Sequence, residues 1–197
     1  ITFNSTFPVK EIEKEKDIII DEIHSYKDTP AEQIYDDFET HLFNRHPLGS
    51  NILGTVESVK SFKQKHIIDF IKRHYLIKNM VFSIVGNYKK EHVKKVMEKH
   101  FAHYSTKGNP SIRKAPTLNK TFQVVNKINA NQSHCIIGSL APSSASKKRT
   151  AMVLLNNLLG GTGMNSRLNL NIREKYGFAY NLDSNYVAYS DTGLFAV

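Results

Sequence analysis

The chain has 197 residues, of which 40% are hydrophobic, with one cysteine and a formal net charge of +9. This length and apolar content support one large or two small folded domains and argue against intrinsic disorder. A single cysteine excludes an internal disulfide framework and a zinc site of paired thiolates, and no run reaches the roughly 20 apolar residues of a membrane span.

The positive charge would suit an acidic partner such as nucleic acid. However, the lysines are dispersed over several predicted elements instead of forming one stripe, and no nucleic-acid-binding motif is present. We therefore expect a basic, solvated surface on a soluble chain, with no nucleic-acid partner and no membrane span; the sequence leaves the localisation unknown. Cys135 lies in an apolar run, which predicts a small core residue.

Two amphipathic helices are predicted at the start of the chain. Isoleucines with helical spacing follow Pro8 and predict a helix that ends near Lys27. Thr29 and Glu32 have the spacing of a capping box, and Pro30 suits the first position of a second helix, with Phe38 on its apolar face.

Further elements follow in order along the chain. The patterns predict a turn-rich loop from His46 to Gly54, helices around residues 67–75 and 93–100, and a buried strand at 80–85. Residues 105–119 are rich in polar residues, Gly and Pro, which is typical of a linker. Beyond it we predict strands at 122–126, 135–140, 178–188 and 193–197, and helices at 151–159 and 168–175, the two helices being joined by a glycine-rich turn.

Two glutamates on the first predicted helix are candidates for metal chemistry. Glu15 and Glu22 lie seven residues apart, about two helical turns, so their carboxylates project from nearly the same side. Carboxylate oxygen is a normal zinc ligand. The spacing alone is also what any solvated helix shows, because exposed Glu and Lys pairs are common there.

A second pair of candidates is Arg173 and Tyr180. Arg173 lies at a predicted helix end and Tyr180 in the predicted strand after it, and Gly177 permits the turn between them. A guanidinium and a phenol brought together could hold a peptide carbonyl or stabilise an oxyanion. Read from these residues alone, a helix-terminal cation and an ordinary strand aromatic are the simpler interpretation. None of the nine histidines forms an HExxH or HxxEH motif.

Several segments together resemble a known family. The segments are IEKEKDIIIDEI (12–23), HPLGSNILGTVESV (46–59), HYLIKNMVFSIVGNY (74–88), LLGGTGMNSRLNLNIREKYGFAYNLDS (158–184) and DTGLFAV (191–197). In this order they resemble the pitrilysin, insulinase and mitochondrial-processing-peptidase family of zinc metallopeptidases. The resemblance covers almost the whole chain.

The resemblance implies roles for the four candidates. In that family two histidines of an HxxEH helix and a glutamate about 80 residues later hold the zinc, and the HxxEH glutamate acts as general base. Glu22 matches the third zinc ligand, and Glu15 the glutamate that orients the ligands. Arg173 and Tyr180 match the pair that binds the substrate peptide and steadies the oxyanion.

The resemblance also implies an α+β fold of the metallohydrolase-like LuxS/processing-peptidase type. We expect parts of two homologous modules, each a mainly antiparallel sheet with helices packed on it: residues 1–104, a linker at 105–119, and residues 120–197. The HxxEH helix is missing, so the chain alone should be inactive. Helix faces around Ile19, Ile23 and Phe38 should stay partly uncovered, and a homo-oligomer or hetero-oligomer, such as a dimer, is implied.

Two functional alternatives remain. The first is a zinc-dependent metalloendopeptidase that encloses peptides or unfolded segments in a chamber. The second is a non-catalytic peptide-binding or assembly subunit of such a peptidase. Because Glu15, Glu22, Arg173 and Tyr180 occur together, the first is favoured.

Overall fold

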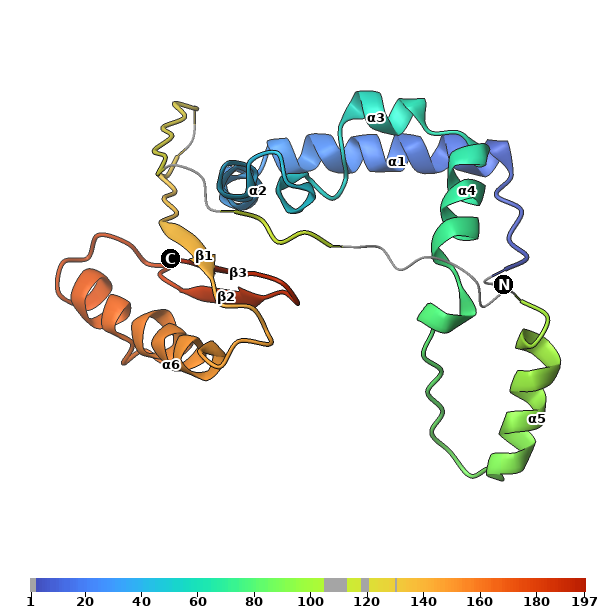
Figure 1. The fold of residues 1–197 in the computed structure, drawn as a ribbon. Helices are drawn as coiled ribbons and strands as arrows, with labels where there is room; N and C mark the ends of the chain where they lie inside the picture. The colour runs from blue at the N-terminus through green and yellow to red at the C-terminus, as the bar shows by residue number, and fades with distance from the viewer. Residues whose placement is uncertain (1–2, 105–112, 118–120, 130) are drawn as a thin grey trace. The chain divides into compact units, whose positions relative to one another are not determined.

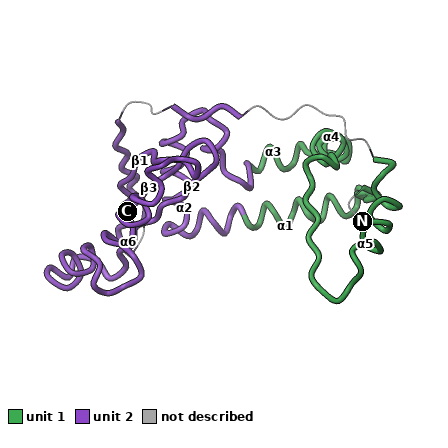
Figure 2. Tube along the Cα trace, turned by 60° about the horizontal axis from the view of Figure 1, so that its bottom comes forward, with its two compact units in different colours: residues 1–22, 55–112 green, residues 23–54, 113–197 purple. Residues whose placement is uncertain are grey.

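The computed structural model describes residues 3–104, 113–117, 121–129 and 131–197. The chain divides into two compact units, one of residues 1–22 and 55–112 and the other of residues 23–54 and 113–197 (Figure 2). Helix α1 (Val9–Lys27) runs from the first unit into the second. Residues 23–54 thus cluster with the C-terminal part of the chain, whereas most of the predicted linker lies outside the described residues. The predicted division into modules 1–104 and 120–197 stays a prediction.

The first unit is helical in its described part (Figure 1). After α1 it contains α3 (Val56–Ser61), α4 (Gln64–His74), a 3-10 turn (Ile77–Asn79) and α5 (Lys90–Phe101). The predicted helices around 67–75 and 93–100 are confirmed as α4 and α5. Thr55 and Ser58 form a reciprocal capping box that starts α3.

The predicted strand at 80–85 does not form in the described part of the chain. The segment is extended but pairs with no other strand there. Val81 and Val85 are 96% and 98% exposed. A strand is stable only when a neighbour takes its backbone hydrogen bonds, and no described segment does so here.

The second unit is built on a three-stranded antiparallel sheet. Its strands are β1 (Gly138–Ala141), β2 (Asn185–Ala188) and β3 (Gly193–Ala196), in the order β1-β3-β2. Helices α2 (Pro30–Phe43) and α6 (Arg149–Gly160) lie on opposite faces of this sheet (Figure 1). A 3-10 turn (Pro47–Gly49) and a π-helix (Asn169–Glu174) complete the unit. The α+β fold class is confirmed.

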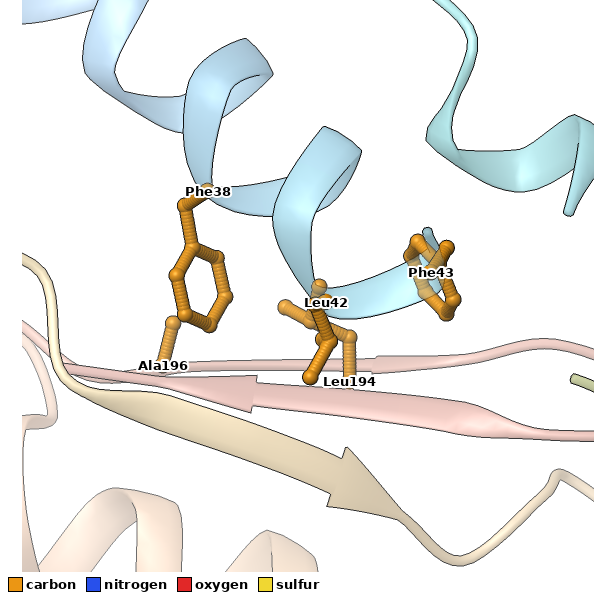
Figure 3. Packing of buried hydrophobic residues seen from close by; sticks show 5 residues of the cluster. All are labelled: Phe38, Leu42, Phe43, Leu194 and Ala196. Atoms are coloured by element: carbon orange, nitrogen blue, oxygen red, sulfur yellow. The ribbon is translucent and has the colours of Figure 1, made fainter. Parts of the chain in front are cut away.

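The core of the second unit lies between α2 and the sheet. Phe38, Leu42 and Phe43 of α2 pack against Leu194 and Ala196 of β3 (Figure 3). Gly138 is opposite Ala196 in the neighbouring strand. A Cβ there would collide with the Phe195 carbonyl oxygen and lie 2.7 Å from Cζ of Phe38. The absence of a side chain at Gly138 is therefore what lets the phenylalanine ring reach the sheet.

Hydrogen bonds hold residues 44–54 within the second unit. His46 Nε2 donates to the carbonyl of Lys114 at 2.8 Å, and Thr40 Oγ1 donates to the carbonyl of Gly49 at 2.9 Å. These contacts explain why this stretch clusters with α2 and residues 113–197 and apart from α3, the helix that follows it.

Five local predictions were wrong. Thr29 makes no capping box, because its hydroxyl donates to the carbonyl of Ser25 at 3.1 Å in the preceding helix. Cys135 is exposed, because the predicted strand around it starts only at Gly138. Residues 122–126 form no strand, since no described strand lies beside them, and the strand predicted at 178–188 begins only at Asn185. Ile23 and Phe38 are buried instead of partly uncovered.

Candidate functional site

Helix α1 places Glu15 and Glu22 in the first unit, both exposed. Their neighbours Glu11 and Glu13 are paired with lysines one turn on, at 3.1 Å to Lys14 and 2.8 Å to Lys16. Among the described residues, the Glu15 and Glu22 side chains make neither an ion pair nor a hydrogen bond. Their carboxylates are therefore free to accept an external ligand.

The described residues do not form a zinc site by themselves. Among them, no group of three or more His, Cys, Asp or Glu side chains could hold a metal ion. A protein zinc site takes three or four such ligands. Glu22 could supply one carboxylate of a site whose other ligands come from elsewhere.

Arg173 lies in the last turn of the π-helix Asn169–Glu174, in the second unit. Its side chain is 40% exposed, and Nε lies 3.7 Å from the carboxylate of the adjacent Glu174. Single π-turns are rare and are often found at functional sites. The guanidinium has donors left for a further acceptor, since one exposed carboxylate at this distance occupies few of its five N–H groups.

Gly177 reverses the chain between Arg173 and Tyr180, as predicted. Its φ is +65°, and its N–H donates to the carbonyl of Arg173 at 2.9 Å. Tyr180 follows in an irregular segment ahead of β2, not in a strand, and is 83% exposed. The structure thus holds Arg173 and Tyr180 on either side of one glycine turn, whereas Glu15 and Glu22 belong to the other unit.

The segment that carries Tyr180 is held at its far end by Ser184. Ser184 N–H donates to the carbonyl of Gly160 at 3.1 Å, and Ser184 Oγ donates to the carbonyl of Asn156 at 2.9 Å. Both carbonyls belong to the last turns of α6. Sequence reasoning missed Ser184, because the residue lies inside the strand predicted at 178–188 and nothing local signals its contact with a helix 28 residues away.

Shifted pKa values gather around α2, away from these four candidates. Burial raises the pKa of Glu39, and the neighbouring carboxylate of Asp36 raises it further. Burial and the Asp37 carboxylate raise the pKa of Asp36. Asp36 also accepts a hydrogen bond from Asn51 at 2.6 Å. Burial and the Glu39 carboxylate raise the pKa of Tyr189. These groups flank the core, so packing accounts for their shifts.

Among the described residues, none of the helices has the length and apolar character that crossing a membrane requires.

Comparison with known proteins gives concordant results. Residues 61–197 match the family model described as the peptidase M16 inactive domain. Over 195 residues the chain is 32% identical to the uncharacterized zinc protease YmxG of Bacillus subtilis, covering 99% of this chain and 47% of that protein.

Solved structures of the same fold are also found. The peptidase M16 inactive domain structure from Pseudomonas fluorescens superposes with a TM-score of 0.86 at 20% identity, covering 99% of this chain and 47% of that one. A chain of complex III2 from Candida albicans gives a TM-score of 0.71 at 17% identity, with 95% and 48% covered.

The matched family model accounts for most of the sequence, and the chain spans about half the length of the relatives it matches. The resemblance to zinc peptidases of the pitrilysin type is thereby confirmed. The match covers Arg173 and Tyr180, and the relatives align over nearly all of the chain, including α1. This chain belongs to the peptidase M16 family.

Proposed function

We propose that the chain is part of a zinc-dependent metalloendopeptidase that hydrolyses peptides or unfolded segments in an enclosed chamber. Membership of a peptidase family and a relative named as a zinc protease support this. In this proposal the chain contributes one zinc ligand and a substrate-binding pair, and it is inactive alone because it lacks the HxxEH motif.

The observation that carries the proposal is the arrangement around Gly177. An exposed phenol and a guanidinium with spare donors flank one tight turn. Both are donors to oxygen, and a peptide carbonyl or the oxyanion that develops from it accepts from such groups. In the full-length protein Arg173 would hold the substrate carbonyl and Tyr180 would stabilise the developing negative charge.

For α1 the proposed roles are unequal. The Glu22 carboxylate would be a zinc ligand in the full-length protein, where zinc supplies Lewis-acid activation of water. Glu15, two turns earlier on the same helix, would orient the ligand set through hydrogen bonds, as outer carboxylates commonly do at zinc sites.

The proposed protein works as a homo-oligomer or hetero-oligomer with a peptide as substrate. A neighbour of the same fold is a chain of complex III2. Exposed apolar side chains in both units of this chain offer surface for such association.

Replacing Tyr180 tests the proposal. In the full-length protein that contains this chain, Tyr180→Phe should lower kcat/KM for a peptide substrate by about 100-fold, because one oxyanion donor is removed while the ring stays. Zinc content should not change. Tyr176→Phe is the matched control, since Tyr176 is exposed on the other side of Gly177. Wild-type kinetics of Tyr180→Phe would refute the assigned role.

A second candidate is a non-catalytic peptide-binding or assembly subunit, which the description of the matched model as an inactive domain favours. Reading the coding sequence about 80 residues before Glu22 would distinguish the peptidase from the non-catalytic subunit. An HxxEH motif there supports the peptidase, and its absence supports the subunit.

A further inference from the structure

The segment 178–183 is a short arch whose first end is fixed to the π-helix. Gly177 N–H donates to the carbonyl of Arg173 at 2.9 Å, and Phe178 N–H donates to the carbonyl of Ile172 at 3.2 Å. The backbone that leads to Tyr180 therefore starts from the same turn that carries Arg173.

The other end of the arch is fixed to the C-terminal end of α6. Ser184 is 7% exposed, and its N–H and Oγ donate to two carbonyls of that helix, Gly160 and Asn156. Gly160 is itself buried, and a Cβ on it would collide with the Ser184 nitrogen and lie 2.8 Å from Ser184 Oγ. The close approach of helix and arch thus requires both the glycine and the small hydroxyl residue.

Between these anchors, Tyr180 has little packing of its own. Its side chain is 83% exposed. Of the flanking residues, Ala179 is half-buried and Asn181 is exposed. A side chain without neighbours keeps its place only through its backbone. Fixing both ends of a short segment removes much of its conformational freedom, so the anchors determine where the phenol can lie relative to Arg173.

We propose that Ser184 and Gly160 are positioning residues that clamp the arch and so limit where the phenol of Tyr180 can lie relative to the turn that carries Arg173. This inference rests on the proposed role of Tyr180 in substrate binding. It adds a structural device, the clamp between α6 and the arch, that the resemblance does not assign.

A double-variant cycle in the full-length protein tests the clamp. Ser184→Ala should lower kcat/KM by about 10-fold, because a buried hydrogen bond is lost and the arch is loosened. In the Tyr180→Phe background the same change should cost almost nothing, since the group it positions is already gone. Ser184→Thr keeps the hydroxyl and should retain more of the rate than Ser184→Ala. Ser139→Ala is the control, because the Ser139 hydroxyl only donates to the carbonyl of the next residue.

A second measurement does not depend on activity. In this chain, Ser184→Ala should raise the hydrogen-exchange rates of the amides of residues 178 and 184, the backbone donors at the two ends of the arch, several-fold while those of α2 stay unchanged. If Ser184→Ala unfolds the protein, Gly160→Ala takes its place in both measurements.

The outcomes separate the two proposals. If Tyr180→Phe has wild-type kinetics, the role of Tyr180 fails and the clamp has nothing to position. If Tyr180→Phe lowers kcat/KM but Ser184→Ala does not, only the clamp is overturned. The same holds if both variants lower kcat/KM and their effects multiply in the double variant.

Discussion

At the scale of single residues, two neighbouring residues of α1, Glu22 and Ile23, differ sharply in exposure. Glu22 is exposed, whereas the next residue, Ile23, is 6% exposed and belongs to the second unit. The buried isoleucine fixes the rotation of the helix about its axis at this point. Glu22 and Glu15, two turns apart on this helix, are both exposed.

Replacing each glutamate by its isosteric amide should separate their roles in the full-length protein. Glu22→Gln should lose bound zinc, because a neutral amide is a poor ligand for this cation. Glu15→Gln should retain more zinc and lose activity by about 10- to 100-fold, as expected for a residue that orients ligands. Metal analysis and peptide hydrolysis give the two readouts.

This chain alone serves as the reference for that experiment. One carboxylate cannot replace a complete ligand set, so calorimetry on this chain should detect weak zinc binding at most. The Glu22→Gln variant of the chain should bind zinc equally weakly. Tight stoichiometric binding through Glu22 in the chain alone, or unchanged metal and activity in both full-length variants, would contradict the assignment.

At the scale of elements, helices were predicted better than strands, for a physical reason. The helix α1 is specified by its own sequence, through isoleucine spacing and charged pairs one turn apart. The segments 80–85 and 122–126 have apolar runs suited to strands, but strand formation depends on a partner that their own sequence does not supply. Among the described residues, predicted strands form only where β3 pairs with two neighbours.

The candidate site shows the same distinction. Glu15, Glu22, Arg173 and Tyr180 were predicted because they stand in recognisable segments, and the turn at Gly177 because glycine has a local conformational role. The anchor at Ser184 could not be predicted, since it exists only through packing of α6 beside the arch.

Gly138 offers a test of how helix α2 and the sheet fit together. Gly138→Ala should destabilise the second unit by about 1–3 kcal/mol, because the new methyl group has no space between the β3 backbone and the Phe38 ring. Thermal denaturation measures the loss. Ser139 in the same strand is exposed, so Ser139→Ala is the control and should leave the melting temperature nearly unchanged. A melting temperature of Gly138→Ala equal to that of the wild type would contradict the packing.

At the scale of the whole molecule, uncovered apolar side chains are common in both units. In the first unit they include Val81, Phe82 and Val85 of an extended segment; in the second, Leu154 and Leu158 of α6. Within the described parts of the chain, strands β1 and β2 each pair with a neighbour, β3, on one edge alone. Extended apolar segments and open sheet edges favour pairing with further strands.

We therefore expect the purified chain to self-associate. Light scattering at tens of micromolar, within the range of about µM to mM at which such surfaces associate, should give a mass above the 22.4 kDa of one chain. Val81→Lys with Val85→Lys should lower the associated fraction, and Val9→Lys, at an exposed position on α1, is the matched control. A stable monomer at that concentration would count against strand pairing.

The exposed thiol of Cys135 provides a chemical reporter for the outer edge of β1. It is the one cysteine of the chain and lies just before β1, an outer strand of the sheet. Ile137 and Val197 already exchange backbone hydrogen bonds at that end of the sheet, so the backbone near the thiol is held in register. Alkylation of the native chain would therefore attach a dye to one known position, and the rate of alkylation would register any polypeptide that docks along that edge.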